Sequence, residues 1–429
     1  MKRTRVAIVA DLLEEGWPSM DLVADMLLDR LRSEHAHAIE ATLIRPPMRR
    51  RAGVLPGVRG AAPALAFDRV VNRLWDYPRA LAPFADAHDV FHIVDHSYSQ
   101  LVHRLPAERT LVTCHDLDTF RSVLDPEREH RSPPFRMMTR HILDGLRKAG
   151  HIACDTAATR DALVERAGVP AERTTVVYNG PHPSCSPAAD PPADVEASRM
   201  LGPRPSTSSR QAGVEILHVG STIPRKRLDV VIRVFAGVRR RNPHVRLVRV
   251  GGTLTGEQRA LARELGVADA IVSLPFLDRS TLAAVYRRSA LLILPSEREG
   301  FGLPVLESLA CGTPVVASDL DALREVGGTA ATYCAVDRVD EWVAAVMALL
   351  EIRAQRPDEW RARREAGIAR ANAFSWSRYT TDIVGLYQQL TKKATEEHRK
   401  TQMVSGVLVC ILFLCCSVFF CGLSSPPLV

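Results

Sequence analysis

Two glutamates lie around a glycine turn in the second half of the chain, with the spacing Glu-x7-Glu. They are Glu299 and Glu307, and the turn itself reads Glu299-Gly300-Phe301-Gly302-Leu303. Pro304 suits the start of a helix, because its missing N–H would have no partner there. Glycines let a ligand approach the backbone, and the free amides of a helix start attract anions. We expect a phosphate site here, beside carboxylates that accept hydrogen bonds from hydroxyl groups.

A single acidic residue near the start of a helix commonly caps that helix. Capping would explain Glu299 or Glu307 alone, but it does not explain the presence of both. The residues that precede the turn, 291–294, are all apolar and are typical of a strand buried on both faces of a parallel sheet. The helix that follows carries its apolar stripe on Val305, Leu306 and Leu309. The turn is therefore predicted at the carboxyl end of a buried strand.

A basic pair follows another apolar run, residues 214–219. The sequence continues Gly220-Ser221-Thr222-Ile223-Pro224-Arg225-Lys226 and then enters a helical pattern. A solvated charge cluster is the alternative reading. However, a basic pair between a strand and a helix lies at the edge where open sheets bind ligands. We predict that Arg225 and Lys226 hold an anionic group and stabilise charge that develops on it.

Histidines follow two further apolar runs. His96 follows 90–94, and His115, with Asp116 next to it, follows 111–114. Both are expected at the carboxyl edge of a parallel sheet, where ligands bind. A structural role stays open for His96, whereas His115 is the better-placed candidate for a site.

The whole chain reads as two Rossmann-like α/β domains that face each other across a cleft. Strand-like runs alternate with helical patterns, as in parallel sheets covered by helices. The first domain is predicted over 1–182 and the second over 213–374. Residues 183–212 are rich in Pro, Ala and Ser and are predicted to be a linker.

The stretch Ser296 to Gly312 resembles the signature of the retaining glycosyltransferases of family 4, which have the two-Rossmann GT-B fold. The resemblance extends over about 6–390. It implies that Glu299 contacts the donor sugar and that Glu307 holds the ribose of a nucleoside diphosphate sugar. It also implies that His115 lines the donor-sugar site.

The same resemblance implies that Arg225 and Lys226 hold the donor diphosphate, and that a helix over 375–392 crosses back to the first domain. Two positions depart from the family. Gly16 stands alone where a two-glycine loop usually approaches the phosphates, and Ser221 stands where members can have an arginine. Donor-binding residues are thus predicted at the turn and at these two positions: Glu307, Gly300, Phe301, Gly302, Leu303, Gly16 and Ser221.

The composition of the chain indicates which kinds of ligand it binds. The 429 residues carry a net charge of +7, which favours anionic ligands. Nucleic acid is disfavoured because the arginine runs 49–51 and 239–241 have no interleaved aromatic residues. Two D-x-D patterns, 116–118 and 319–321, match metal-binding motifs, but the cations described above already neutralise a diphosphate. We expect no metal and no cofactor beyond the nucleotide-sugar substrate.

The end of the chain differs in kind. Residues 403–423 carry no charge and are long enough to cross a bilayer, and Lys392, Lys393, Arg399 and Lys400 precede them. A buried core helix is the alternative. We predict a transmembrane helix, a single-pass membrane protein with its catalytic domains on the cytoplasmic side, and a hydroxyl acceptor that is lipid-linked or part of a cell-envelope glycan precursor.

The predicted activity is a metal-independent, retaining hexosyl transfer from a nucleoside diphosphate sugar to a hydroxyl group. Two alternatives stay open. One is a non-catalytic, membrane-tethered protein that binds a sugar nucleotide, and the other is a nucleotide-sugar epimerase of the same fold. No G-x-G-x-x-G follows the first strand, which argues against a dinucleotide dehydrogenase.

Overall fold

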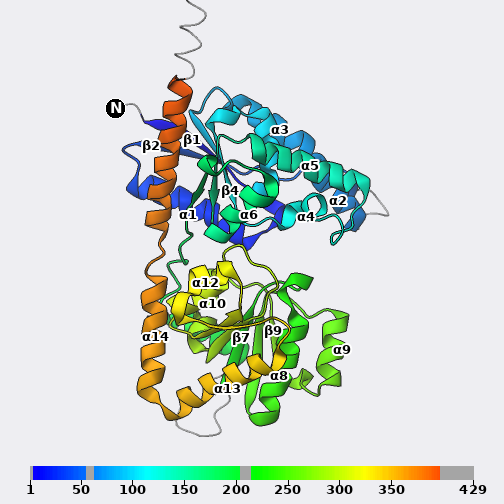
Figure 1. Cartoon of the computed structure of the whole chain (residues 1–429), viewed down its shortest axis with the longest axis vertical. Coiled ribbons are helices and arrows are strands. Elements are labelled where there is room, and N and C mark those ends of the chain that lie inside the picture. The colour runs from blue at the N-terminus through cyan, green and yellow to red at the C-terminus, as the bar shows by residue number, and fades with distance from the viewer. Residues whose placement is uncertain (1–2, 55–61, 203–213, 397–429) are drawn as a thin grey trace, which may run out of the picture.

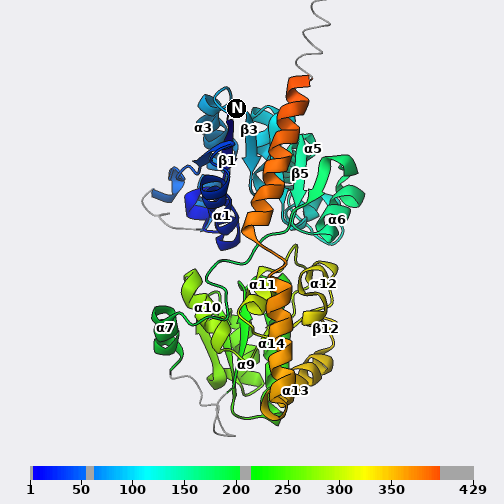
Figure 2. The same cartoon turned by 90° about the vertical axis from the view of Figure 1, so that its left-hand side faces the viewer.

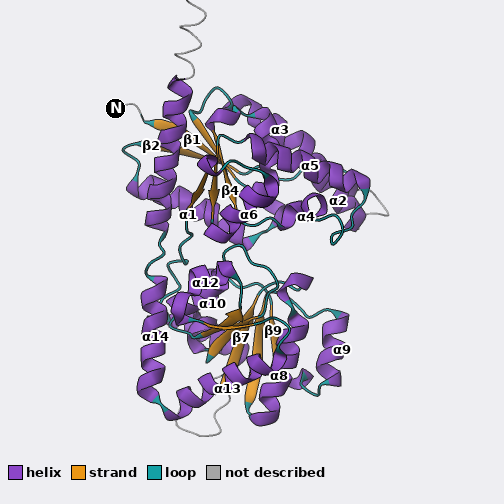
Figure 3. Ribbon diagram, viewed as in Figure 1, coloured by secondary structure: helices purple, strands orange, loops and turns teal. Residues whose placement is uncertain are grey.

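The computed structural model describes residues 3–54, 62–202 and 214–396, which form two α/β domains stacked along the long axis of the molecule (Figures 1 and 3). Each domain holds one six-stranded sheet in which the observed pairings are all parallel. Helices lie on both faces of such a sheet, because parallel strands need crossover connections. The central strands are therefore short apolar runs that are buried on both faces.

The first domain has the strand order β2-β1-β3-β4-β5-β6. Its strands are β1 (Thr4–Val9), β2 (Ile39–Ile44), β3 (Val90–Ile93), β4 (Thr110–Cys114), β5 (His151–Cys154) and β6 (Thr174–Val176). Its helices are α1 (Pro18–Glu34), α2 (Ala62–Val71), α3 (Tyr77–Leu81), α4 (Arg121–Leu124), α5 (Pro133–Lys148) and α6 (Ala157–Ala167).

The second domain has the strand order β12-β11-β10-β7-β8-β9. Its strands are β7 (Val214–Val219), β8 (Val245–Val250), β9 (Ile271–Leu274), β10 (Leu291–Leu294), β11 (Val315–Ser318) and β12 (Thr332–Cys334). Its helices are α8 (Leu228–Arg241), α9 (Gly256–Glu264), α10 (Arg279–Arg288), α11 (Leu303–Ala310), α12 (Asp321–Gly327), α13 (Val339–Gln355) and α14 (Pro357–Ala371).

The direction in which strands are added reverses once in each sheet. In the second sheet this switch lies between β7 and β10, which pair directly through Ile216 with Leu291 and Leu217 with Leu292. The chain leaves both strands at the same edge, so the loops after β7 and β10 diverge around a crevice. The predicted basic pair and the predicted glycine turn are these two loops.

The segment predicted as a linker, 183–212, contains a helix, α7 (Pro191–Leu201). The Asp190 side chain caps it by accepting a hydrogen bond from the Ala193 N–H at 3.4 Å. Ala193, Ala197 and Leu201 are buried in the core of the second domain. The Pro- and Ala-rich composition therefore belongs to a packed helix over part of this segment.

Residues 376–396 are helical and return to the first domain, and Figures 1 and 2 show this helix beside it, above α14. Trp376, Tyr379 and Tyr387 are buried in one core cluster with residues of β1 and α1. Tyr387 also hydrogen-bonds His92 of β3 at 2.7 Å. The last described helix thus joins the two domains by packing against the one that it does not follow in sequence.

The structure corrects the predicted fold class at the end of the chain. The predicted transmembrane segment, 403–423, lies outside the described residues, and no helix within the described ranges is long and apolar enough to cross a membrane. The described C-terminal helix packs its apolar face on the first domain and carries Arg378, Asp382, Lys392 and Lys393 elsewhere, which a membrane-spanning helix would exclude. The fold class is two α/β domains, and we do not retain the predicted single-pass membrane localisation with cytoplasmic catalytic domains.

Candidate functional site

A cavity of about 460 Å³ lies between the two domains, at the carboxyl ends of β1, β4, β7 and β10. Both domains contribute to its lining, and every residue predicted for the site lies on it. These residues are Gly16, His115, Ser221, Arg225, Lys226, Glu299, Gly300, Phe301, Gly302, Leu303 and Glu307. Within each domain these residues follow parallel strands, which end at the same edge of a sheet, and the two edges face each other across the cavity, so residues up to 291 positions apart are brought together.

Lys226 and Glu299 form a close ion pair at the switch between β7 and β10. The Lys226 Nζ donates to Glu299 Oε1 at 2.6 Å, and the side chains are only 11% and 7% exposed. Burial alone would raise the pKa of Glu299, but the charges of Lys226 and Arg225 outweigh it and lower that pKa overall. Glu299 is therefore a carboxylate at neutral pH, and it engages the cation predicted to bind phosphate.

Arg225 reaches from the second domain to two carboxylates of the first. Its Nε lies 3.2 Å from Asp118 Oδ2, and its Nη2 lies 3.8 Å from Asp116 Oδ2. Arg298, four residues after the end of β10 at Leu294, donates to the same Asp118 at 2.9 Å. These aspartates form the first D-x-D pattern, and both are engaged by arginine side chains.

The second D-x-D pattern is exposed and lies elsewhere. Asp319 pairs with Arg324, and its pKa is lowered mainly by that hydrogen bond. Over the described ranges, no group of three or more His, Cys, Asp or Glu side chains has a geometry that could hold a metal ion. Metal independence itself stays a prediction, because the test is activity rather than geometry.

Gly300 is the point at which the glycine turn meets the first domain. A Cβ added there would lie 1.7 Å from the His115 carbonyl oxygen, so only glycine fits. The Thr156 hydroxyl of the first domain donates to the Gly300 carbonyl at 2.8 Å. The turn is thereby fixed against the loop that follows β4.

Gly302 is the N-cap of α11 and has φ = 90°, a conformation that residues with a side chain rarely adopt. The helix begins at Leu303 with Pro304 in its first turn. Glu307 is the fifth residue of α11, in the second turn of that helix.

Glu307 is 3% exposed and is held from α10. The Tyr286 hydroxyl donates to Glu307 Oε2 at 3.0 Å, and Arg279 Nη1 lies 3.8 Å from Oε1. Burial raises the pKa of Glu307, although Arg279 and Tyr286 oppose that effect. Oε1 is consequently the oxygen that remains available to a ligand in the cavity.

His115 is buried, and both of its ring nitrogens are bonded within the first domain. Nδ1 lies 2.5 Å from Asp155 Oδ2, and Nε2 lies 2.7 Å from the Val94 carbonyl oxygen. A carbonyl oxygen only accepts, so Nε2 carries a proton, and the carboxylate favours a second proton on Nδ1. Burial lowers the pKa of His115, but Asp155 raises it to about 10 overall. His115 is therefore a fixed cation and not a general base.

His96, for which a structural role had stayed open, supports His115. Its Nδ1 accepts a hydrogen bond from the His115 backbone N–H at 3.2 Å, and its Nε2 lies 3.2 Å from the Thr119 hydroxyl. It lines a neighbouring cavity of about 410 Å³ in the first domain, together with His115, Asp116 and Arg225. The two cavities share His115, Asp116 and Arg225, and also Glu15, Trp17 and Met20.

Three functional residues were missed in the sequence. Asp155 directly follows the strand run 151–154, and that position at a strand end was the available signal. Arg279 and Tyr286 belong to a helix that leads into the glycine turn and carries no motif, so nothing in the sequence indicated their contacts with Glu307.

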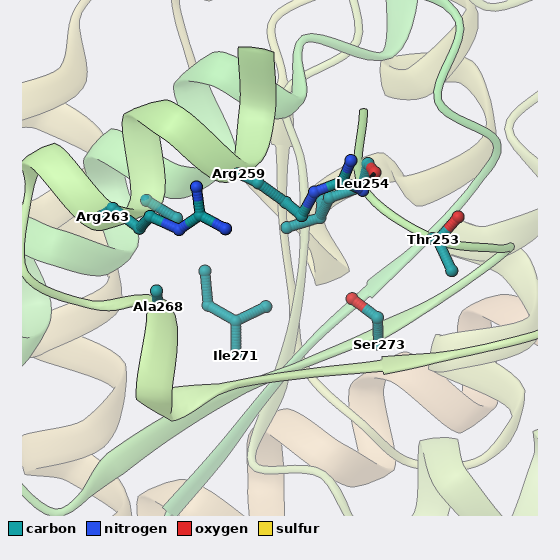
Figure 4. A pocket seen from close by; sticks show the side chains of 8 residues that line it. Thr253, Leu254, Arg259, Arg263, Ala268, Ile271 and Ser273 are labelled. Carbon is teal, nitrogen blue, oxygen red and sulfur yellow. Dashed lines mark hydrogen bonds between the residues drawn. The ribbon is translucent and has the colours of Figure 1, made fainter. Parts of the chain in front are cut away.

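A further cavity, of about 280 Å³, lies between α9 and the edge strand β9 (Figure 4). Arg259 and Arg263 project from α9 beside this cavity, and the Arg259 guanidinium donates a hydrogen bond to the Leu254 carbonyl. None of the predicted site residues lines it. The inter-domain cavity is therefore the candidate site.

Comparison with known proteins identifies the class. Residues 24–184 match the family model for Glycosyltransferase Family 4, and residues 204–366 match the model for Glycosyl transferases group 1. The two matches fall on the two domains. The chain belongs to the group 1, family 4 glycosyltransferases, and its fold is GT-B.

Solved structures agree with this fold. A sucrose-phosphate synthase from Thermosynechococcus elongatus is 18% identical, has a TM-score of 0.69, and the match covers 91% of this chain and 100% of that one. The Anabaena protein Alr3699/HepE, in complex with UDP and glucose, is 17% identical with a TM-score of 0.66, covering 90% and 100% of the two chains. At such identities the likeness shows the fold alone.

Among curated proteins, a D-inositol 3-phosphate glycosyltransferase of Segniliparus rotundus is 35% identical over 208 residues, which cover 46% of this chain and 43% of that protein. The protein of the same description from Actinosynnema mirum is 31% identical over 263 residues, covering 56% and 60%. The chain thus spans about half the length of the curated relatives that it matches.

Proposed function

We propose that this chain is a retaining glycosyltransferase that moves a sugar from a nucleoside diphosphate sugar to a hydroxyl acceptor. The observation that supports it most is the cavity between the domains. There the Glu299–Lys226 pair, the start of α11 and Glu307 face the backbone of His115 in the other domain. Anion-binding groups and hydroxyl-binding carboxylates are thus combined in one place.

Different residues of the cavity bind different parts of the donor. Lys226, Arg225 and the first amides of α11 hold the diphosphate, and the Glu307 oxygen beside Arg279, Oε1, accepts a ribose hydroxyl. Glu299 accepts from hydroxyls of the donor sugar. The diphosphate competes with Glu299 for Lys226, so binding repositions the ammonium group between carboxylate and phosphate.

In the transfer step the bond between the anomeric carbon and the phosphate oxygen breaks, and a bond from that carbon to the acceptor oxygen forms on the same face. The leaving diphosphate takes the acceptor's proton. Lys226 and Arg225 stabilise the negative charge that builds on the phosphate. Both ring nitrogens of His115 are bonded, so it does not take that proton but adds a fixed positive charge beside the reaction.

The acceptor occupies the neighbouring cavity of the first domain, which shares His115, Asp116 and Arg225 with the donor cavity. Because two curated relatives are described as D-inositol 3-phosphate glycosyltransferases, phosphorylated and free polyols belong in the acceptor panel. A lipid-linked acceptor was predicted from the apolar run 403–423, and we do not propose one.

We also propose that transfer needs no metal ion. Asp116 and Asp118 are engaged by Arg225 and Arg298, and the phosphate charge is met by side-chain cations. Turnover should therefore survive excess chelator. Loss of turnover that magnesium or manganese restores would contradict this part of the proposal.

The test is to incubate the full chain with a panel of nucleoside diphosphate sugars, with and without polyol and sugar acceptors, and to follow nucleoside diphosphate release. We expect one donor to be consumed in an acceptor-dependent way, and Lys226→Ala to abolish most of that release. Conversion of the donor to an epimer without an acceptor would favour the epimerase alternative. Binding without any turnover would favour the non-catalytic alternative.

A further inference from the structure

Arg249 lies in the second sheet, on the strand next to the edge strand β9, behind the loops that line the donor cavity. It belongs to β8, and its side chain is fully buried, with 0% of the residue exposed. The Nη2 atom donates to the Gly220 carbonyl at 3.0 Å and to the Gly251 carbonyl at 2.9 Å. Gly220 and Gly251 follow β7 and β8, and both line the donor cavity.

The two glycine loops touch each other directly. Gly251 has φ = 123°, and a Cβ added there would lie 2.2 Å from the Gly220 carbonyl oxygen. A movement of one loop therefore moves the other. Because the C=O and N–H of a trans peptide point in opposite directions, a Gly220 carbonyl that faces Arg249 turns the Ser221 N–H away from it.

Arg249 has no acidic partner among the residues that the structure describes. Its Nε and Nη1 also have no hydrogen-bond partner there. The residue beside it in the sheet, His218, is equally buried, and burial together with the charges of Arg249 and Lys226 lowers the pKa of His218 to about 3. His218 is consequently neutral. A guanidinium stays charged in proteins, and burying one without a counter-charge is costly.

The other cations of the cavity are already balanced. Lys226 pairs with Glu299, and Arg225 lies within 4 Å of Asp116, Asp118 and Glu299. Arg279 lies 3.8 Å from Glu307, and the cationic His115 is paired with Asp155. The residue directly after Gly220 is Ser221, which brings no charge. The lining residues therefore supply no excess of positive charge for a diphosphate, and Arg249 is the nearby cation whose charge is not compensated.

We propose that Arg249 is a positioning residue for the donor diphosphate: it holds the Gly220 and Gly251 carbonyls against the sheet, and its unpaired charge is compensated by the bound phosphates. This inference rests on the proposed function, because it assigns the anion to the same cavity. It identifies the class of ligand as a diphosphate group rather than the base or the sugar.

Calorimetry on the full chain tests the proposal with three probes: a nucleoside diphosphate, the matching nucleoside, and inorganic pyrophosphate. The variants are Arg249→Met, which keeps the volume and removes the charge, and Arg249→Lys, which keeps the charge. Arg246→Met is the matched control. Arg246 lies on the same strand and donates to Glu215 and to the Leu201 carbonyl, away from the cavity.

We expect Arg249→Met to weaken the nucleoside diphosphate and pyrophosphate by about tenfold, the effect of one charge acting through a partly screened site. Nucleoside binding should stay unchanged, and Arg249→Lys should bind both anions more tightly than Arg249→Met. The melting temperature of Arg249→Met should not fall, because the change removes an unpaired buried charge. Arg246→Met should lower the melting temperature, since Glu215 loses a partner, and leave the three affinities unchanged.

Equal affinities of wild type and Arg249→Met for the two anions would overturn the proposal. Parallel losses for nucleoside and nucleoside diphosphate, with a lowered melting temperature, would also overturn it by showing that Arg249 only supports the fold. If Arg249→Met and Arg249→Lys weakened binding of the two anions equally, the charge of Arg249 would have no role in binding. If the wild type binds pyrophosphate but no nucleoside diphosphate, the proposed function fails while the pyrophosphate comparison still decides the role of Arg249. If it binds neither, both fail.

Discussion

The Glu299–Lys226 pair gives the sharpest single prediction, because the two residues are expected to serve one ligand and yet neutralise each other without it. Glu299→Gln keeps the shape of the side chain and removes its charge. Lys226 then loses a partner at 2.6 Å, and the diphosphate no longer faces a carboxylate. We expect nucleoside diphosphate to bind more tightly to this variant, whereas sugar transfer falls because the contact to the donor sugar is lost.

The size of the gain follows from the contact. A hydrogen bond between charged groups contributes about 1.5 to 3 kcal/mol, and part of it is regained by water around Lys226 in the variant. A gain of about 1 to 2 kcal/mol in binding, roughly 5- to 30-fold in the dissociation constant, is the expected range. The ion pair is buried, so this gain should depend only weakly on salt.

Calorimetric titration of wild type and Glu299→Gln with nucleoside diphosphate is the assay. Glu297→Gln is the matched control, because Glu297 lies in the same loop but is 40% exposed and pairs with Arg227, away from the cavity lining. Its affinity should equal that of the wild type. An unchanged or weaker affinity in a folded Glu299→Gln variant would refute the reasoning, since Lys226 would then not be shared between carboxylate and phosphate.

Three further predictions concern the same cavity. Lys226→Ala should weaken nucleoside diphosphate far more than nucleoside in a calorimetric titration, and equal losses would remove Lys226 from the phosphate site. Tyr286→Phe removes the hydroxyl that holds Glu307 at 3.0 Å and should raise the KM for the donor by a free-energy equivalent of about 1 to 2 kcal/mol. An unchanged KM would show that Glu307 needs no such support. The pKa of His115 is raised from 6.5 to about 10, chiefly by Asp155 against the effect of burial, so its contribution to stability is complete below about pH 6.5 and is lost as the pH rises through 10. The melting temperature of the wild type should therefore exceed that of Asp155→Asn most at pH 6 to 7 and approach it near pH 10, and a constant difference would contradict the pairing.

Many of the residues that line the cavity could be predicted from the sequence, because of the way parallel sheets are built. Gly16, His115, Lys226 and Glu299 each follow an apolar strand run, and parallel strands deliver such positions to one edge of a sheet. No detail of packing is needed for that inference. The two-domain α/β architecture follows from the same alternation of strands and helices.

Contacts made by side chains on helices and in the middle of strands could not be predicted from the sequence. Tyr286 and Arg249 occupy positions that look like ordinary helix and strand residues, and their roles depend on which carboxyl or carbonyl groups the fold places opposite them. The protonation of His115 likewise depends on Asp155, forty positions away in the sequence. These features are properties of packing and not of local pattern.

Helix α7 could have been predicted from its sequence pattern, although the composition of its segment suggested a linker. Asp190 before two prolines is a good helix start, and Ala193, Ala197 and Leu201 repeat every four residues on the buried face. The abundance of Pro, Ala and Ser suggested a linker, yet alanine favours helices and proline is tolerated in a first turn. The positions of the proline and alanine residues in this segment therefore indicate its structure better than their abundance does.

Proton NMR of one reaction that contains the full chain, a nucleoside diphosphate sugar and a hydroxyl acceptor tests whether the chain transfers a sugar with retention of configuration. We expect the anomeric signal of the donor to disappear only when the acceptor is present. A new anomeric signal of the same configuration should replace it, in a step that Lys226→Ala suppresses. A product of inverted configuration, release of free sugar at the same rate without acceptor, or an unchanged donor spectrum across the panel would contradict it.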